Sequence, residues 1–395
     1  MPQIINPKDK KLPVPSFAEL CQPLQDTVGC APPLESRSNR PLALTFEDQL
    51  KALIFYHLEE HTSGRHLLQV LEEDDFARKT VAPAGGIRTS TFFETLNTRG
   101  SSQFLHVYAS LQPQAFRFLP GAYESLGSLV AIDSSLIDAV LSMSWADYRK
   151  GTKKARIHLG FDISRSVPSK FFLTDGKSGE RPFVSQILSR GQTGVTDRGY
   201  QDHKTFDRLQ TEGKHFVCRI KGNTKKTVIS ENPVSPGSIV FYDAAVYLGT
   251  PGVSRTEKEL RLVGYRVGNT AYWVATDRSD LSAEDIAAIY RLRWDIEKFF
   301  AWWKRHLKVY HVIARSRHGL TVQILAGLIT YLLLALYFRI RNNEKVSIRR
   351  VRQLRSEIRN TQHSVPEKQP PATYNINIHI IKLLSFEINI TLKSD

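Results

Sequence analysis

The segment that decides the fold is YRLRWDIEKFFAWWK, residues 290–304. At about 100° per residue of an α-helix, Tyr290, Arg293, Glu297 and Lys304 lie within one stripe roughly 60° wide. The apolar residues fall in a separate sector, which predicts the core-facing side: Leu292, Ile296, Phe299 and Trp303. A single helix is therefore predicted to present a carboxylate beside two cations and a phenol. Such a group suits a metal-dependent enzyme acting on phosphodiesters, whereas the plainer interpretation is an amphipathic helix with an Arg293–Glu297 pair.

The composition predicts a globular protein with a polyanionic partner. The chain has 395 residues, of which 41% are hydrophobic, which is enough for two or three domains and a sizeable core. Lysine and arginine outnumber aspartate and glutamate by 54 to 39, and the net charge of +15 favours nucleic acid before membrane. Three scattered cysteines, Cys21, Cys30 and Cys218, do not make a disulfide framework or a cysteine zinc site. Reduced, intracellular thiols are therefore expected.

One apolar segment, VQILAGLITYLLLALYF at residues 322–338, has the composition of a membrane span. It is short for a bilayer crossing and directly follows the charged segment described above. A buried core helix is therefore predicted, with no membrane partner. The N-terminus lacks the apolar core of a signal peptide, so a cytoplasmic protein is expected.

The order of sequence patterns divides the chain into parts. Helical patterns begin after the capping residue Thr45, and SGRHLLQVLEED, a PAGG turn and RTSTFFETLNTRG follow. This arrangement is compatible with a helix-turn-helix DNA reader and equally with a plain helical bundle. The predicted parts are an N-terminal arm (1–40), a helical unit that is a candidate DNA-end-binding domain (41–120), a catalytic domain (121–226 and 271–340), a β insertion (227–270), and a basic C-terminal helix and tail (341–395).

From residue 126 the pattern changes to short β-rich runs separated by turn signals. Three such runs are followed by a helix in GERPFVSQILS, a strand in TGVT, a helix in HKTFDRLQTEG and a strand in HFVCRIKGN. This order predicts a mixed α/β sheet with helices. Over 227–275, β-type patterns joined by Pro- and Gly-rich turns predict the insertion within it.

Two aspartates occur where apolar strands are expected to end. Asp133 ends the run SLVAI, and Asp197 follows TGVT. A carboxylate just past a buried strand lies at the carboxyl edge of the sheet, where ligand sites of α/β proteins form. Together with Glu297 they could hold two hard divalent cations around a scissile phosphate. Asp133 as a turn residue and Asp197 as a helix cap remain open, and three further aspartates compete as ligands: Asp138, Asp162 and Asp295.

On these motifs the chain resembles the bacterial insertion-sequence transposases of the DDE type that carry the YREK signature. The segment 290–304 matches the spacing Y-x2-R-x3-E-x6-K, while Asp133 in AIDSS and Asp197 in TDRGY match the settings of the two family aspartates. The resemblance covers roughly residues 45–360. It leaves residues 364–395 without a matching family feature.

The resemblance implies a ribonuclease H-like catalytic core interrupted by a β insertion. It implies that Asp133, Asp197 and Glu297 bind two Mg2+ ions, for which Mn2+ can substitute. The implied partners are the inverted terminal repeats of the element and a double-stranded target DNA, with a homodimer on the paired DNA ends. The implied reaction cuts the element ends and joins their 3′ hydroxyls to the target.

The same resemblance implies contacts with DNA. Tyr290, Arg293 and Lys304 would hold the phosphate backbone and terminal nucleotides near the cut. Trp273, at the start of the last strand of the insertion, is either a platform for an extruded base or a core residue. Other cations are expected to reach phosphate or to remain solvated, namely Arg198, Arg219, Lys221 and the arginines of 339–359.

Two rival functions remain open from the sequence. The first is a decayed or domesticated protein that binds DNA without cutting it. The second is a metal-dependent nuclease on the same core, in which water rather than a DNA 3′ end attacks.

Overall fold

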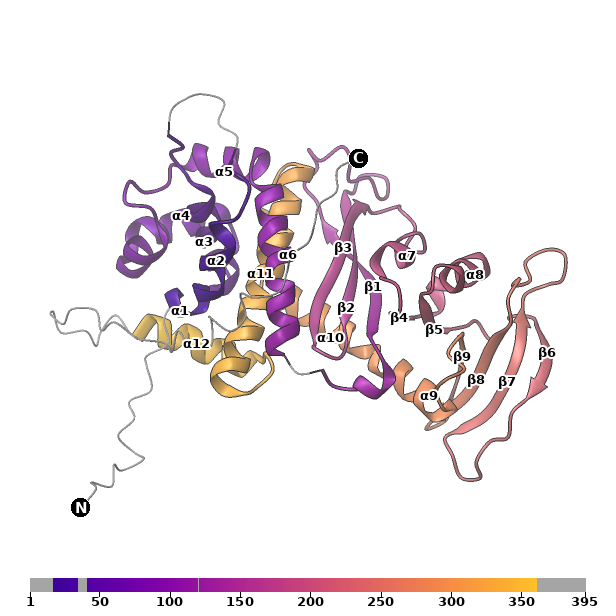
Figure 1. Cartoon of the computed structure of the whole chain (residues 1–395). Helices are drawn as coiled ribbons and strands as arrows, with labels where there is room; N and C mark the ends of the chain where they lie inside the picture. Colours follow the sequence, from indigo (N-terminus) through magenta and orange to yellow (C-terminus); the bar gives the residue numbers. More distant parts are fainter. Residues whose placement is uncertain (1–16, 35–40, 120, 361–395) are drawn as a thin grey trace, which may run out of the picture.

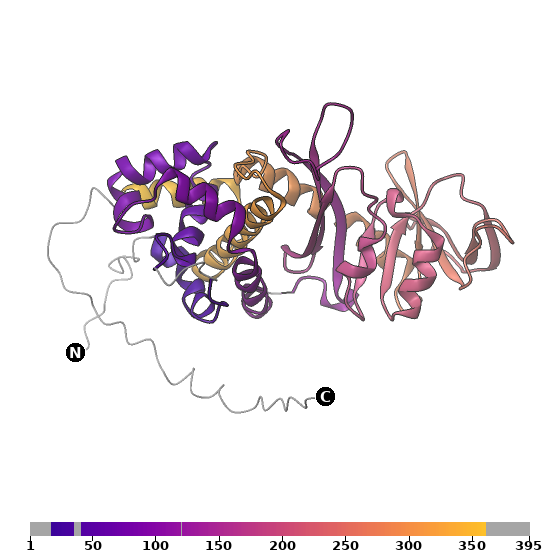
Figure 2. The ribbon, with the colours of Figure 1, turned by 90° about the horizontal axis from the view of Figure 1, so that it is seen from above.

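The computed structural model describes residues 17–34, 41–119 and 121–360. A helical part, a central sheet and a β-rich extension follow one another along an elongated molecule (Figures 1 and 2). The first and the last helices of the described residues lie together in the helical part (Figure 1). The predicted tail at 364–395 lies outside the described residues.

The N-terminal helices begin at local signals that the sequence carries. Thr45 and Asp48 form a reciprocal capping box at the start of α3, with Asp48 N–H donating to Thr45 Oγ1 at 3.1 Å. Ser63 caps α4 in a similar way by accepting from His66 N–H. The helices are α1 (Phe17–Cys21), α2 (Gln25–Val28), α3 (Phe46–Leu58), α4 (Gly64–Glu73), α5 (Thr89–Thr98) and α6 (Ser101–Phe118).

The N-terminal arm expected over 1–40 forms short helical turns over residues 17–28. Phe17 and Leu20 on α1 are 1% and 0% exposed, and the Phe17 ring meets Phe55 edge-on at 5.9 Å. Residues 17–28 therefore belong to the core, because these apolar side chains find partners on helices far away in the sequence.

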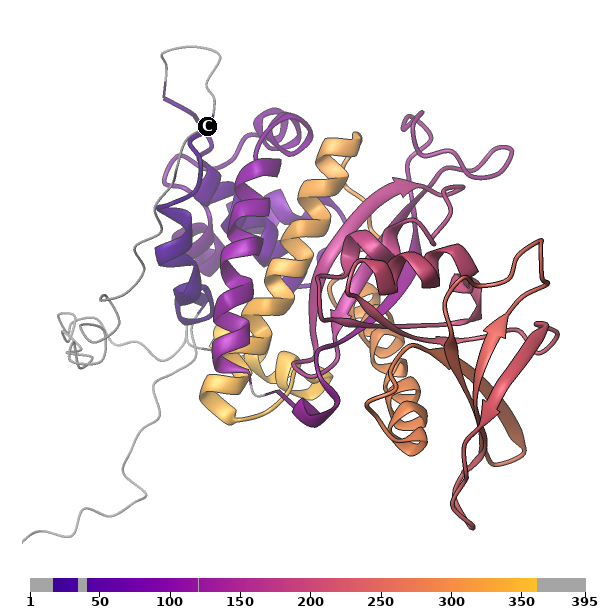
Figure 3. The same cartoon turned by 45° about the vertical axis from the view of Figure 1, so that its right-hand side comes forward.

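The apolar segment predicted as a core helix is the centre of helix α11 (Arg317–Asn342). By length and composition this helix could cross a membrane, but 94% of its apolar window is buried inside the protein. It stands beside α6 and next to the sheet (Figure 3). Its burial on all sides explains why it is apolar all round.

One mixed sheet contains every strand of the described residues, in the order β3-β2-β1-β4-β5-β9-β8-β7-β6. β1, β4 and β5 are mutually parallel, and the other neighbours are antiparallel. The strands are β1 (Leu129–Asp138), β2 (Lys154–Asp162), β3 (Val167–Asp175), β4 (Thr193–Thr196), β5 (His215–Arg219), β6 (Lys226–Glu231), β7 (Val240–Leu248), β8 (Leu260–Val267) and β9 (Thr270–Thr276). The predicted mixed α/β class is confirmed.

The β-rich insertion extends the central sheet. Its last strand, β9, pairs directly with β5, from Val217↔Thr276 to Arg219↔Val274. The two faces of the sheet carry separate apolar clusters, and side chains alternate between them along each strand. One face is covered by α7 (Phe183–Ile187) and α8 (His203–Thr211), and the other by α9 (Ala283–Leu292), α10 (Trp294–His306) and α11.

The outer edge of β3 is covered by side chains of the helical part. Tyr108 and Gln112 of α6 donate to the backbone oxygens of Ser169 and Pro168, and Arg317 of α11 donates to that of Leu173. These donors satisfy carbonyls that would otherwise form an open strand edge. They also fix the sheet against the helical part.

Candidate active site

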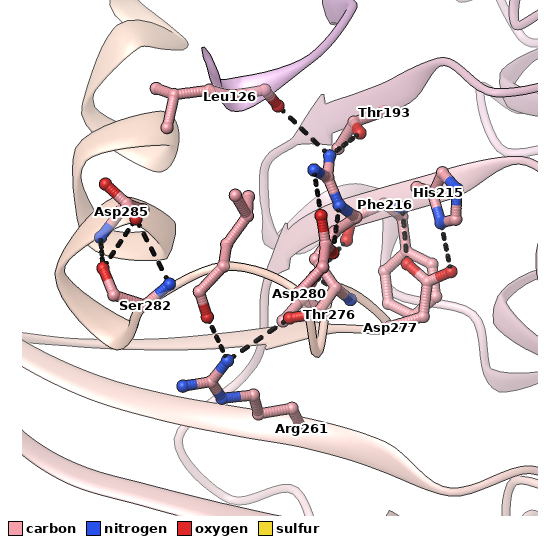
Figure 4. Close-up of polar contacts among 12 residues, drawn as sticks. Leu126, Thr193, His215, Phe216, Arg261, Thr276, Asp277, Asp280, Ser282 and Asp285 are labelled. Carbon is pink, nitrogen blue, oxygen red and sulfur yellow. Dashed lines mark hydrogen bonds and ion pairs between the residues drawn. The ribbon is translucent and has the colours of Figure 1, made fainter.

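The signature residues 290–304 lie on two consecutive helices, α9 and α10, which together are called the signature helix. The loop between β9 and α9 determines where it begins (Figure 4). Asp277 accepts from Phe216 N–H at 3.0 Å and from His215 Nδ1 at 2.9 Å, which ties the loop to β5. The buried Arg278 donates to Thr193 Oγ1 at 2.7 Å and to the backbone oxygen of Leu126. A capping box between Ser282 and Asp285 then starts α9. The loop therefore connects the signature helix to the amino ends of the central parallel strands.

The predicted single helix over 290–304 is divided into α9 and α10 at Arg293. Arg293 keeps a right-handed helical backbone, with φ −54° and ψ −30°, but the hydrogen bonds around it tighten to a three-residue spacing. Its guanidinium donates to Glu297 Oε1 at 2.7 Å. The plain i,i+4 pair that the sequence allowed is therefore present, and it lies beside the carboxylates described next.

Asp133 and Asp197 come from neighbouring parallel strands. β1 pairs with β4 from Leu129↔Thr193 to Ala131↔Val195, and the same register continued places Asp133 level with Asp197. β4 ends at Thr196, whereas β1 continues to Asp138, so Asp133 lies within its strand rather than at its end. Asp197 caps the short 3-10 turn η5 (Arg198–Tyr200) by accepting from Gly199 N–H at 2.8 Å. The two carboxylates thus share the carboxyl edge of β4.

The electrostatics of the site connect these aspartates to the signature helix. Burial raises the pKa of Asp133 to about 6, and the Ser134 N–H and the Arg293 guanidinium oppose that rise. Asp197 and a third acid, Glu180, raise the same pKa further. The Arg293 guanidinium thus binds Glu297 of α10 and also lowers the pKa of Asp133 on the sheet.

The donor set consists of carboxylate oxygens, which are the ligands that Mg2+ prefers. Asp133 and Asp197 repel one another, and a cation between them would relieve that repulsion, so these two residues fit a divalent ion. Among the described residues, however, no three Asp, Glu, His or Cys side chains are close enough together to hold one ion. Glu297 is instead directed to Arg293.

The competing aspartates have local partners. Asp138 pairs with Lys154, Asp162 accepts from the Arg165 N–H at 2.7 Å, and Asp295 pairs with Lys298 at 2.9 Å. These contacts account for the three residues without a catalytic role.

Tyr290 lies in a cluster of aromatic and cationic side chains on the face that carries Asp133. It is 4% exposed, and its ring centroid is 6.2 Å from that of Tyr272 on β9. The Arg219 guanidinium of β5 lies 4.7 Å from the Tyr272 ring, and both Arg293 and Arg219 influence the phenol of Tyr290. Arg219 is thus brought beside the signature helix.

Trp273 lies on the opposite face of the sheet. It packs against Phe241 and Tyr242, and Lys226 Nζ is 4.0 Å from its ring centroid. Strand alternation therefore directs Tyr272, not Trp273, toward Tyr290. The base-stacking role of Trp273 stays a prediction without support from its position.

The remaining predicted DNA contacts are spread around the site. Lys304 on α10 lies 4.8 Å from the centroid of the Tyr310 ring. Arg198 and Lys221 are exposed, on η5 and just after β5. The Lys221 N–H donates to Gln201 Oε1, which orders the backbone there. The structure thus places Arg198 and Lys221 on the surface near the ends of β4 and β5, and Lys304 on α10.

The C-terminal end of α10 is held by residues far away in the sequence. Glu60, after α3, pairs with Arg355 of α12 (Ile348–Asn360) and lies 3.6 Å from His306 and 3.5 Å from Lys308. His57 Nδ1 lies 2.6 Å from the Leu307 oxygen. This α10 clamp, Glu60 with Arg355, His306 and Lys308, joins the first and last described helices to the signature helix.

Two residues of the site were missed from the sequence. The Tyr200 hydroxyl is buried, and burial with the charges of Asp133, Glu180 and Asp197 raises its pKa well above the ordinary value. Glu180 accepts from Ser134 Oγ at 2.6 Å. Tyr200 is the last residue of the TDRGY motif and could have been found from that motif. Glu180 lies in a turn, where no sequence motif marks it as a site residue.

Comparisons with known proteins match the part of the chain that contains this candidate site. A sequence profile of the family described as Transposase DDE domain matches residues 124–333. The chain is 30% identical over 212 residues to a protein of Geobacillus stearothermophilus named as a probable transposase for insertion sequence element IS5377. It is 27% identical over 224 residues to one of Sinorhizobium fredii named as transposase y4zB, and 24% identical over 258 residues to one of Synechocystis named as a transposase for insertion sequence element IS4SA. The matches cover 52%, 55% and 62% of this chain and 55%, 63% and 71% of the relatives, so the chain spans little more than half the length of the first.

Proposed function

This protein belongs to the transposase DDE domain family, and from that premise we propose that it is a DNA transposase of a bacterial insertion sequence. It would bind the inverted terminal repeats of its element, cut the element ends and join their 3′ hydroxyls to target DNA. The observation that carries the proposal is the level placement of Asp133 and Asp197 on neighbouring parallel strands, with the Glu297 helix packed against β1. The strand order β3-β2-β1-β4-β5, antiparallel and then parallel, supports a ribonuclease H-like core.

The roles of the side chains follow from their positions. Asp133, Asp197 and Glu297 would hold two Mg2+ ions, which supply a polarised phosphate and an activated attacking oxygen when bound. Arg293, which donates to Glu297, would orient the glutamate and bind a phosphate oxygen. Tyr290 and Arg219 would contact the backbone beside the cut from the same face.

The proposed chemistry is tested by strand-specific cleavage. DNA cloned from both flanks of the gene is incubated with Mg2+ and either the wild-type protein, Glu297→Gln or Asp295→Asn. We expect cuts at defined positions in the wild type, loss of at least about a hundredfold in Glu297→Gln, and normal cutting in Asp295→Asn. Asp295 is a matched control, because it lies on the same helix in a separate ion pair.

The outcomes separate the rival functions. DNA binding without cutting in every protein would favour a decayed or regulatory DNA-binding protein. Cutting without joining of a labelled 3′ end to a second DNA would favour a nuclease.

The metal ligands are tested without a cleavage assay. Mn2+ binding to the full chain is followed by electron paramagnetic resonance. We expect Asp133→Asn and Asp197→Asn each to weaken it by at least about tenfold, with Asp295→Asn unchanged. Equal Mn2+ binding in all four proteins would remove these residues from the ligand set.

Binding of the DNA ends is proposed for the helical unit and the C-terminal helix. On α5, Phe92 and Leu96 are buried while Thr89, Ser90 and Glu94 face solvent, as in a helix that reads DNA. On α12, Arg350, Arg355 and Arg359 form ion pairs, so Arg349 and Arg352 are the better candidates for phosphate contacts. A cytoplasmic homodimer on paired DNA ends is expected, and light scattering that finds a monomer in the cutting complex would overturn it.

A further inference from the structure

A groove leaves the proposed catalytic centre along the edge of β1. β4 ends level with Ile132, so within the described sheet β1 pairs only with β2 from Ser134 onward. A cavity of about 540 Å³ opens along this stretch. It begins one residue after Asp133 and reaches the last turn of the signature helix; Ser134, Asp138, Lys154, Arg156, Lys304 and Tyr310 are among the residues that line it.

One wall of this β1-edge groove offers a cation beside an aromatic ring. Tyr310, just after α10, is 45% exposed. Lys304 Nζ lies 4.8 Å from the centroid of its ring and 5.6 Å from that of Phe300. In the described part of the chain, Lys304 forms no ion pair with a carboxylate. The ring and the ammonium group are therefore both available to a ligand.

The other wall carries cations held in place by acids. Lys154 pairs with Asp138, while Arg156 pairs with Glu180 and also donates to the Gly176 oxygen at 3.1 Å. The hairpin loop between β1 and β2 adds exposed positive charge at Arg149 and Lys150. Cations on both walls with one exposed aromatic ring suit the phosphates and bases of a single nucleic-acid strand, because a paired duplex does not expose its base faces.

We propose that the β1-edge groove binds one strand of the DNA beside the cut, with a base stacked on Tyr310 and phosphates bound by Lys304 and Lys154. The proposal rests on the proposed function, since it identifies where the DNA of that same site runs. It assigns a substrate contact to Tyr310 and Lys154, which lie outside the signature and the acidic residues.

The test measures binding by the full chain rather than cleavage. Duplexes taken from the flanks of the gene carry a single-stranded tail of either polarity with one 2-aminopurine, whose fluorescence falls when it stacks. Tyr310→Ala is compared with two control variants. Tyr310→Phe keeps the ring, and Phe118→Ala removes a ring on α6 that is 46% exposed. Lys154→Met tests the phosphate contact.

The expected result is specific to tailed DNA. Tyr310→Ala should bind it roughly tenfold more weakly and lose the quenching, whereas Tyr310→Phe and Phe118→Ala should stay within about twofold of the wild type. In a plot of the logarithm of the binding constant against the logarithm of the salt concentration, Lys154→Met should make the slope less steep by about one. If Tyr310→Ala binds tailed DNA and quenches its fluorescence like the wild type, the proposed DNA-binding role of the groove is refuted while the proposed function stands. If the wild type binds neither tailed nor duplex DNA, the proposed function is refuted as well.

Discussion

Arg278 gives the sharpest prediction about how the signature helix is supported. The change is Arg278→Met, which keeps the length of the side chain and removes the guanidinium. Its side chain is 9% exposed and donates to Thr193 Oγ1 and to the Leu126 oxygen, both at the amino ends of the central strands. Losing the donor to the buried Thr193 Oγ1 and to the partly buried Leu126 oxygen should cost about 1–2 kcal/mol each. Its pair with Asp280 adds little, because Asp280 is 61% exposed and regains water.

We therefore expect Arg278→Met to lower the free energy of unfolding by about 2–4 kcal/mol. The measurement is urea unfolding of the full chain followed by tryptophan fluorescence, together with hydrogen exchange over residues 283–292. The matched variant Asp280→Asn removes the exposed partner and should cost less than about 1 kcal/mol. The reasoning is refuted if Arg278→Met stays within about 0.5 kcal/mol of the wild type, or if Asp280→Asn is the more costly change.

Other predictions concern a loop, a buried base and the aromatic cluster. Gly249→Ala should cost at least about 2 kcal/mol more than Gly252→Ala in urea unfolding, because both have positive φ but only Gly249 would place a Cβ 2.3 Å from a backbone oxygen; equal costs would contradict this. His57 is fully buried and burial lowers its pKa to about 4, so its neutral form is required in the folded state. The free energy of unfolding should fall by at most about 3 kcal/mol as the pH falls from about 6.5 toward 4. His57→Gln should flatten this part of the plot of unfolding free energy against pH, and an unchanged slope would contradict the role of His57. Tyr272→Ala should slow DNA cleavage roughly tenfold while Trp273→Phe leaves it near normal, and the reverse order would restore the stacking role of Trp273.

The parts of the fold that could be predicted depend on local patterns. The cap at Thr45, the strand and helix order from β1 to β5 and the buried α11 all follow from residues within one element. The N-terminal turns around Phe17 did not, because they are too short to be stable alone and are held by Phe55 and other distant side chains. The expectation that Asp133 ends its strand was wrong, because β1 continues to Asp138 by pairing with β2.

The sequence indicated a set of candidate site residues but not their arrangement in space. Spacing identified Asp133, Asp197 and Glu297, and the register of two strands explains why the two aspartates meet. The electrostatic influence of Arg293 on Asp133 depends on how α10 packs on the sheet, which no local pattern contains. Strand alternation predicts that Tyr272 and Trp273 lie on opposite faces of the sheet. Only the packing of α9 determines which of the two faces the site.

The α10 clamp also sets an order of events during synthesis. Glu60 and Arg355 lie 295 residues apart in the chain, so Glu60 emerges from the ribosome long before its partner. At 5–20 residues per second, that delay is roughly 15–60 s. Until α12 emerges, the end of the signature helix lacks one of its supports. The nascent chain can therefore complete the support of α10 only after Arg355 has emerged, later than the acidic residues of the sheet.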